Sequence, residues 1–88
     1  MEESKLTAQL NRAGFSRVYA WEDGPHTRYP DHTHPTKIAH IILHGEMTLS
    51  MQSETKTYRT GERCDVPADT IHSDPIGLQG CRYLIGER

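Results

Sequence analysis

The spacing of apolar residues changes character after the first fourteen positions of this chain. Leu6, Leu10 and Ala13 recur at three- and four-residue intervals, which place them on one face of a helix. Gly14 follows as a suitable C-terminal cap. The spacing therefore predicts a short helix over residues 4–14, and we expect it to pack against the main body of the protein.

From residue 15 onward the pattern is typical of short β-strands. Residues 15–21 are rich in β-branched and aromatic side chains, and residues 47–51 alternate apolar with polar positions. Residues 38–44, which include the apolar run over 41–43, predict a strand that ends at Gly45. The expected strands cover residues 15–21, 26–34, 38–44, 47–51, 56–59, 63–66, 71–73 and 80–85. About seven or eight strands, with turn signals every eight to twelve residues, predict an all-β sandwich or barrel.

Length and composition set the scale of this domain. The 88 residues suffice for one domain with a thin core, which we place over 1–88, with the barrel over about 15–86. Hydrophobic residues make up 34% and charged residues 25%, a balance that favours a folded globular chain over a disordered one.

Charge and hydropathy exclude several partners. The net charge is −2 and the acidic and basic residues are scattered, so we expect no nucleic-acid surface. No apolar run approaches the roughly 18 residues of a membrane span. The polar, acidic N-terminus does not resemble a signal peptide, and we expect a cytoplasmic protein. Cys64 and Cys81 are then expected to be reduced thiols.

Candidate chemistry concentrates in residues 31–40, which hold three of the six histidines. His32 and His34 are two residues apart, so on a strand they point to the same side. His40 begins an apolar run and shares a strand face with Ile38. Buried polar groups need partners, and one metal ion would satisfy several imidazoles together.

A second stretch, residues 61–72, runs from Gly61 through Pro67 to His72. Together with the pair His32 and His34 and the later Gly45, it resembles the two motifs of the cupin superfamily, over roughly residues 26–83. The resemblance implies a small cupin-like antiparallel β-barrel, or jelly roll. In such a barrel His32, His34 and His72 would be the three metal-binding histidines inside the mouth.

The resemblance also implies a divalent first-row transition metal (Fe, Zn, Mn, Ni or Co) and a homodimer. Two positions depart from the family pattern: Ile38 replaces a metal-binding glutamate, and Asp69 replaces a glycine in a turn. Asp69 tolerates unusual turn dihedrals, so that departure is mild. The loss of the glutamate draws attention to His40. We expect His40 to be a fourth ligand; the alternatives are an acid–base or substrate contact, or a core histidine.

Two classes of function follow from these expectations. A three-histidine site with an open coordination position suits a mononuclear metal enzyme of dioxygenase or isomerase type, acting on a small molecule. The alternative is a non-catalytic domain that binds or senses a small ligand. The fold supports both classes and does not choose between them.

Overall fold

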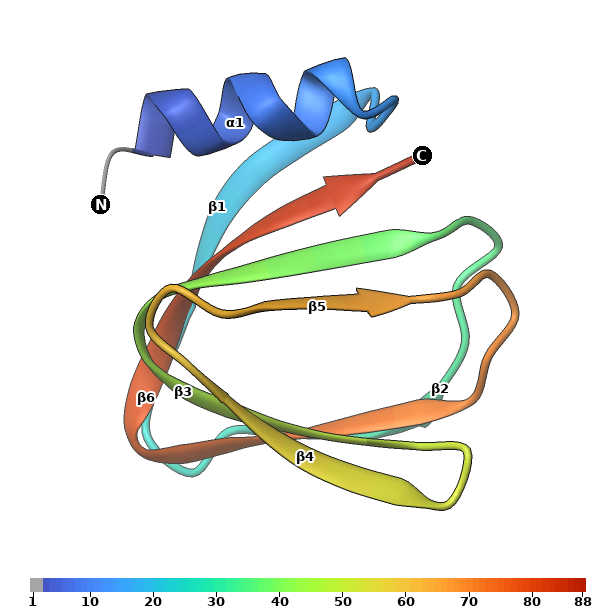
Figure 1. Ribbon diagram of the computed structural model, residues 1–88. Coiled ribbons are helices and arrows are strands. Elements are labelled where there is room, and N and C mark those ends of the chain that lie inside the picture. Colours follow the sequence, from blue (N-terminus) through green and yellow to red (C-terminus); the bar gives the residue numbers. More distant parts are fainter. Residues whose placement is uncertain (1–2) are drawn as a thin grey trace.

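The computed structural model describes residues 3–88, and for residues 74–79 it describes the backbone alone. Over this range one helix precedes six antiparallel strands, which curl into an open barrel (Figure 1). The elements are α1 (Glu3–Arg12), β1 (Arg17–Asp23), β2 (Arg28–His32), β3 (Ile38–Met51), β4 (Glu54–Arg59), β5 (Arg63–Val66) and β6 (His72–Glu87). The sheet has the order β1-β6-β3-β4, while β2 also pairs with β6 and β5 with β3. The predicted all-β, barrel-like fold with a short N-terminal helix is confirmed.

The strand count predicted from the sequence is wrong, because two pairs of expected strands are continuous. Residues 38–44 and 47–51 form the single strand β3, and residues 71–73 and 80–85 fall almost entirely within β6. Both strands bend at the left of Figure 1, and their register shifts on either side of Gly45.

Gly45 therefore bends its strand and does not end it. Its φ is +83° and that of Gly80 in β6 is +79°, a backbone conformation that glycine adopts without strain. A Cβ atom at Gly45 would collide with the backbone carbonyl oxygen of Gly80. The two strands approach closely at this bend, so that both β3 and β6 contribute to both sides of the barrel.

The core lies on both faces of β3. Ile38 and Ile42 face the barrel interior, where they join a buried cluster with Met47 and Leu49. Ala39 and Ile41 lie between these inward-facing residues and face outward. They belong to a second buried cluster beneath the helix, together with Leu10, Phe15 and Leu84. Since β3 is covered on both faces, its first half has the continuous apolar sequence of a buried strand. His40 shares the inward face with Ile38 and Ile42.

Candidate metal centre

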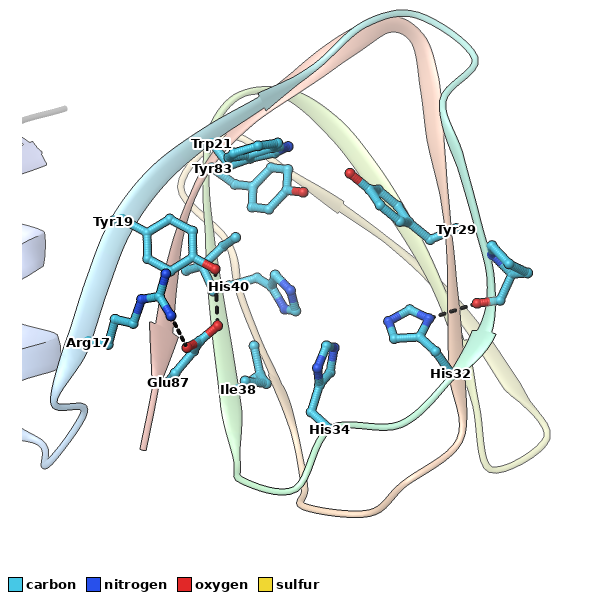
Figure 2. Close-up of a pocket in the computed structure, with 12 residues that line it drawn as sticks. Arg17, Tyr19, Trp21, Tyr29, His32, His34, Ile38, His40, Tyr83 and Glu87 are labelled. Carbon is cyan, nitrogen blue, oxygen red and sulfur yellow. Dashed lines mark hydrogen bonds and ion pairs between the residues drawn. The ribbon is translucent and has the colours of Figure 1, made fainter.

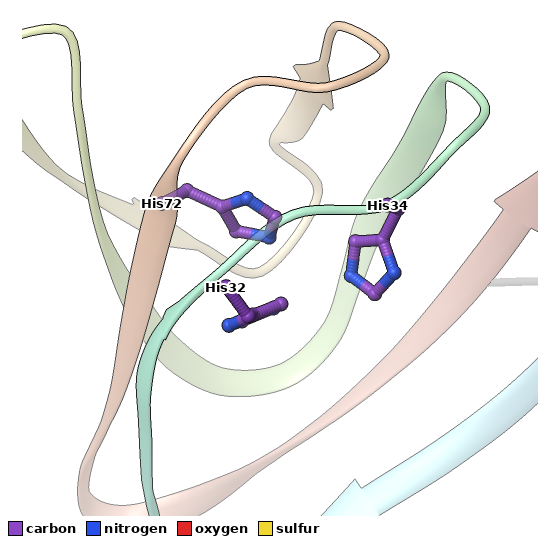
Figure 3. A group of neighbouring side chains, drawn as sticks. All are labelled: His32, His34 and His72. Carbon is purple, nitrogen blue, oxygen red and sulfur yellow. The ribbon is translucent and has the colours of Figure 1, made fainter.

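Three histidines from separate parts of the fold converge at the open end of the barrel (Figure 3). His32 is the last residue of β2 and His72 the first of β6, and the two are register partners. His34 lies in the segment after β2, whose backbone is held by a 2.8 Å hydrogen bond from the Asp69 N–H to the His34 carbonyl. Asp69 has a φ of +57°, so aspartate accommodates the turn in which the related motif has glycine.

The geometry of the three imidazoles suits one metal ion. One potential ligand nitrogen from each ring lies within 4.8 Å of the other two. Ligand atoms bound to one Zn²⁺ at about 2.1 Å lie no more than about 4.2 Å apart, so small rotations of the rings would complete the site. The residues that the family resemblance assigned to the metal are therefore close together in space.

Hydrogen bonds fix which nitrogen of two rings faces the centre. His32 Nδ1 lies 2.7 Å from the Pro30 carbonyl oxygen, and His72 Nδ1 lies 3.0 Å from that of Thr70. A carbonyl only accepts, so in each pair Nδ1–H donates and the Nε2 of the neutral ring keeps its lone pair. This arrangement, in which the outer nitrogen donates to a backbone carbonyl, is usual for metal-binding histidines.

The surroundings of His34 also favour a neutral imidazole at that position. Burial lowers the pKa of His34, and the neighbouring His32 and His72 lower it further. His72 is buried, and its Nε2 has no hydrogen-bond partner. An unpartnered buried nitrogen with a free lone pair is the feature that a bound cation would satisfy.

His40 lines a cavity next to the three histidines, but none of its nitrogens belongs to the group of ligand atoms that lie close enough together to share a metal ion. Its ring packs against that of Tyr83, with 5.7 Å between the centroids, and only 5% of the residue is exposed. Burial and the neighbouring His72 and His34 lower the pKa of His40 to about 4. His40 is therefore a neutral imidazole at physiological pH, and its assignment as a fourth ligand stays a prediction.

Two of the three histidines, His32 and His34, line a cavity of about 530 Å³, a volume typical of small-molecule sites. Figure 2 shows the side chains around it, with His32 and His34 on one side and an aromatic wall facing them. The lining residues are Arg17, Tyr19, Trp21, Tyr29, Pro30, His32, His34, Ile38, His40, Tyr83, Ile85 and Glu87.

The aromatic wall is organised by one buried carboxylate. Tyr29 and Tyr83 each donate a 2.7 Å hydrogen bond to Asp23, and the Trp21 indole N–H donates one of 3.0 Å. Burial and these contacts with Asp23 raise the pKa values of Tyr29 and Tyr83. Three donors from β1, β2 and β6 thus share one acceptor, which ties the three strands together where they line the cavity.

The rim of the cavity carries a second, more exposed carboxylate. Glu87 accepts a 3.0 Å hydrogen bond from Tyr19 and lies 3.6 Å from Arg17. The Arg17 side chain is 72% exposed and lies over the Tyr19 ring, 5.0 Å from its centroid. The polar ends of this wall, like those of the Asp23 group, are therefore paired within the protein.

The sequence did not identify this wall. Its residues belong to no sequence motif: Trp21, Asp23, Tyr29, Tyr83 and Glu87. The pairing of β1 with the end of β6 brings them together, through Trp21 opposite Tyr83 and Arg17 opposite Glu87. The other polar residues near the motif, His26, Arg28, Asp31 and His44, are exposed and do not line the cavity.

The comparisons with known proteins identify the fold. No protein-family model and no curated protein matches the chain. Among solved structures, a cupin-2 domain-containing protein from Shewanella frigidimarina superposes with a TM-score of 0.69 and 20% identity, over 80% of this chain and 67% of its own. An RmlC-like cupin from the same organism gives 0.72 and 14%, over 80% and 62%. The DMSP lyase of Ruegeria pomeroyi gives 0.74 and 22%, over 81% and 36%.

The structure thus defines the class of protein: a curled antiparallel barrel with three histidines at its mouth. The fold is that of the cupin superfamily, which confirms the resemblance found in the sequence. The likeness, at 14% to 22% identity, is one of fold, and this chain spans between 36% and 67% of the length of those three structures. None of the described helices has the length and hydropathy of a membrane span.

Proposed function

We propose that this protein binds one divalent first-row transition metal through His32, His34 and His72, and a small molecule in the cavity beside it. The observation that carries the proposal is His72 Nε2, a buried nitrogen without a hydrogen-bond partner that faces two further imidazoles. Three neutral nitrogen ligands suit Fe, Zn, Mn, Ni or Co better than Mg or Ca, which prefer oxygen ligands.

An enzyme is the form of this function that the cavity favours. Three protein ligands leave coordination positions for a substrate, and the space next to them has the volume of a small-molecule site. A bound divalent ion would act as a Lewis acid on an oxygen atom of the ligand, as an isomerase-type reaction requires, whereas a dioxygenase-type reaction would need a redox-active ion such as Fe at the same site. The chain's own part is to hold the ligand between the histidines and the aromatic wall.

The second candidate is a non-catalytic domain that binds or senses a small ligand. The exposed face of Trp21 and the paired polar groups of its wall would serve such a domain equally well. Turnover of a bound small molecule separates the two candidates, since both bind metal and ligand. A homodimer also remains part of the proposal, and sedimentation equilibrium measures it directly.

Removal of one ligand tests the metal site. We expect His72→Ala to lower the affinity for Zn²⁺ by at least about a hundredfold, since loss of a ligand exceeds the 10- to 100-fold effect of losing an outer partner. His44→Ala is the matched control, because His44 is exposed and lies outside the cavity. Titration calorimetry gives the affinities and circular dichroism checks the fold. A folded His72→Ala protein with unchanged affinity would exclude this ligand set.

A further inference from the structure

One residue that lines the cavity, His40, carries a buried nitrogen that the protein leaves without a partner. Among the buried side-chain nitrogen and oxygen atoms of the described residues, two lack a hydrogen bond: His72 Nε2 and His40 Nδ1. The proposed metal accounts for the first. The second belongs to a residue that lines the same cavity but lies outside the metal-binding group.

The strand pairing prevents His40 from finding a partner by moving. His40 lies in the middle of the sheet, opposite Cys64 of β5 on one side and Ile85 of β6 on the other. Its side chain projects from β3 into the cavity (Figure 2), between those of Ile38 and Tyr83. A central strand with neighbours on both sides holds this ring in place.

Several other polar groups of the cavity are already occupied. The Tyr83 hydroxyl beside His40 donates to Asp23, and the Tyr19 hydroxyl donates to Glu87. His32 is engaged through Nδ1 with the Pro30 carbonyl. Apart from the nitrogens of the three metal-binding histidines, His40 Nδ1 is therefore the buried nitrogen of this region that lacks a partner among the described residues.

The chemistry of His40 defines what that molecule must offer. Its imidazole is neutral and carries a single proton, for which the Cys64 backbone provides a hydrogen-bonding partner. The nitrogen left without a partner is then a lone pair, which accepts a hydrogen bond and repels an anion. A carboxylate or phosphate oxygen does not suit this position, whereas a hydroxyl or N–H group does.

We propose that His40 is a specificity-determining residue that accepts a hydrogen bond, through Nδ1, from a hydroxyl or N–H group of the metal-bound ligand. This inference rests on the proposed function. The ligand class is a small molecule with a metal-coordinating oxygen at one point and a neutral hydrogen-bond donor at another, of which short hydroxy acids are the simplest members. Sites that hydrogen-bond a donor reject analogues that lack it, because their own polar group is then left unpaired.

The test compares hydroxy acids with their methyl ethers. Glycolate, 3-hydroxypropionate and 4-hydroxybutyrate place the hydroxyl at increasing distance from the carboxylate, and each ether keeps the oxygen atoms but loses the donor. Titration calorimetry of the Zn²⁺-loaded protein gives the affinity ratio for each pair. We expect at least one hydroxy acid to bind about tenfold or more tightly than its ether, and His40→Phe to abolish that preference. The matched control is His44→Gln, on the same strand outside the cavity, which should keep it.

The ¹⁵N resonance of His40 Nδ1 provides a readout that does not depend on the metal. It should shift on addition of the preferred hydroxy acid, with or without Zn²⁺, and not with the ether. If wild type fails to bind Zn²⁺, the proposed function fails, and this resonance still decides the role of His40. Equal ratios in wild type and His40→Phe, or no shift with any acid, would overturn the inference. A tenfold loss of Zn²⁺ affinity in His40→Phe would overturn it too, since His40 would then be a metal ligand.

Discussion

The two walls of the cavity satisfy their polar groups in opposite ways. On the aromatic wall, Tyr29, Tyr83 and Trp21 all donate to Asp23, so every hydrogen bond is made within the protein. The histidine wall is formed by His32 and His34, and beside them the buried His72 Nε2 remains unpaired. The first wall is complete without a ligand and contributes to stability, whereas the second is complete only when something binds. The contrast indicates that substitutions on the two walls should have separable effects.

Removal of the Asp23 carboxylate should have the largest effect on stability. Asp23→Ala leaves two tyrosine hydroxyls without their acceptor, and unpaired buried donors cost about 1–3 kcal/mol each. We expect the free energy of unfolding to fall by about 3–4 kcal/mol in urea denaturation. Glu22→Ala, an exposed neighbour on the same strand, is the control and should change it by less than about 0.5 kcal/mol.

The converse change on the histidine wall sharpens the comparison. His34→Ala should lower Zn²⁺ affinity at least about a hundredfold while changing the stability of the metal-free protein by less than about 1 kcal/mol, since His34 is only partly buried. A His34→Ala protein as unstable as Asp23→Ala would show that the two walls are not separable.

The buried histidine predicts a pH dependence of stability in the metal-free protein. The pKa of His40 is about 4 in the folded chain, whereas the ordinary histidine value of 6.5 applies in the unfolded chain. Between these values the unfolded chain takes up a proton that the folded chain does not, so the free energy of unfolding falls as the pH drops from about 6.5 to about 4. The lowered pKa of His34 acts in the same direction.

The decrease in the free energy of unfolding that His40 causes should reach about 3 kcal/mol at pH 4 and vanish above pH 7. Urea denaturation across this range, with a chelator present, measures it. The control is His40→Phe, which keeps a ring at this position but has no titrating group. If the pH profiles of wild type and His40→Phe were parallel, the folded state would bind the proton on His40 as readily as the unfolded state does.

The smallest expected effect links the two walls. Tyr29 reaches Asp23 and also lies beside His32, with 6.4 Å between their ring centroids. Tyr29→Phe removes one hydroxyl while keeping the ring, so we expect a loss of about 1 kcal/mol in stability and less than a threefold change in Zn²⁺ affinity. A larger drop in metal affinity would mean that the aromatic wall positions His32, and the distinction between the walls would break down.

The histidine wall could be predicted from the sequence because its signal is local. His32 and His34 stand two residues apart, and His72 closes a motif with its own glycine and proline. The aromatic wall leaves no such pattern, since tyrosines and a tryptophan in strands resemble core residues. It depends on the register of β1 against β6, which places Trp21 opposite Tyr83.

Two other features could be predicted from the sequence only in part. The inward direction of His40 follows from strand alternation, but its missing hydrogen-bond partner depends on which neighbours already use theirs. Gly45 was interpreted as the end of a strand, because glycine marks both turns and bulges. The close approach of Gly45 to Gly80 distinguishes a bulge from a turn, and it involves residues far apart in the chain.

The long pairing of β3 with β6 also sets an order of assembly. Met51 pairs with His72 near the connection between the two strands, whereas Ile38 pairs with Glu87 at the distant end. Closing a short loop costs less conformational entropy than closing a long one, so pairing should begin near the connection and spread outward. His72 would then be in place before Glu87 and the aromatic wall. During folding, one of the three metal-binding histidines would therefore be positioned before the far end of the cavity is built.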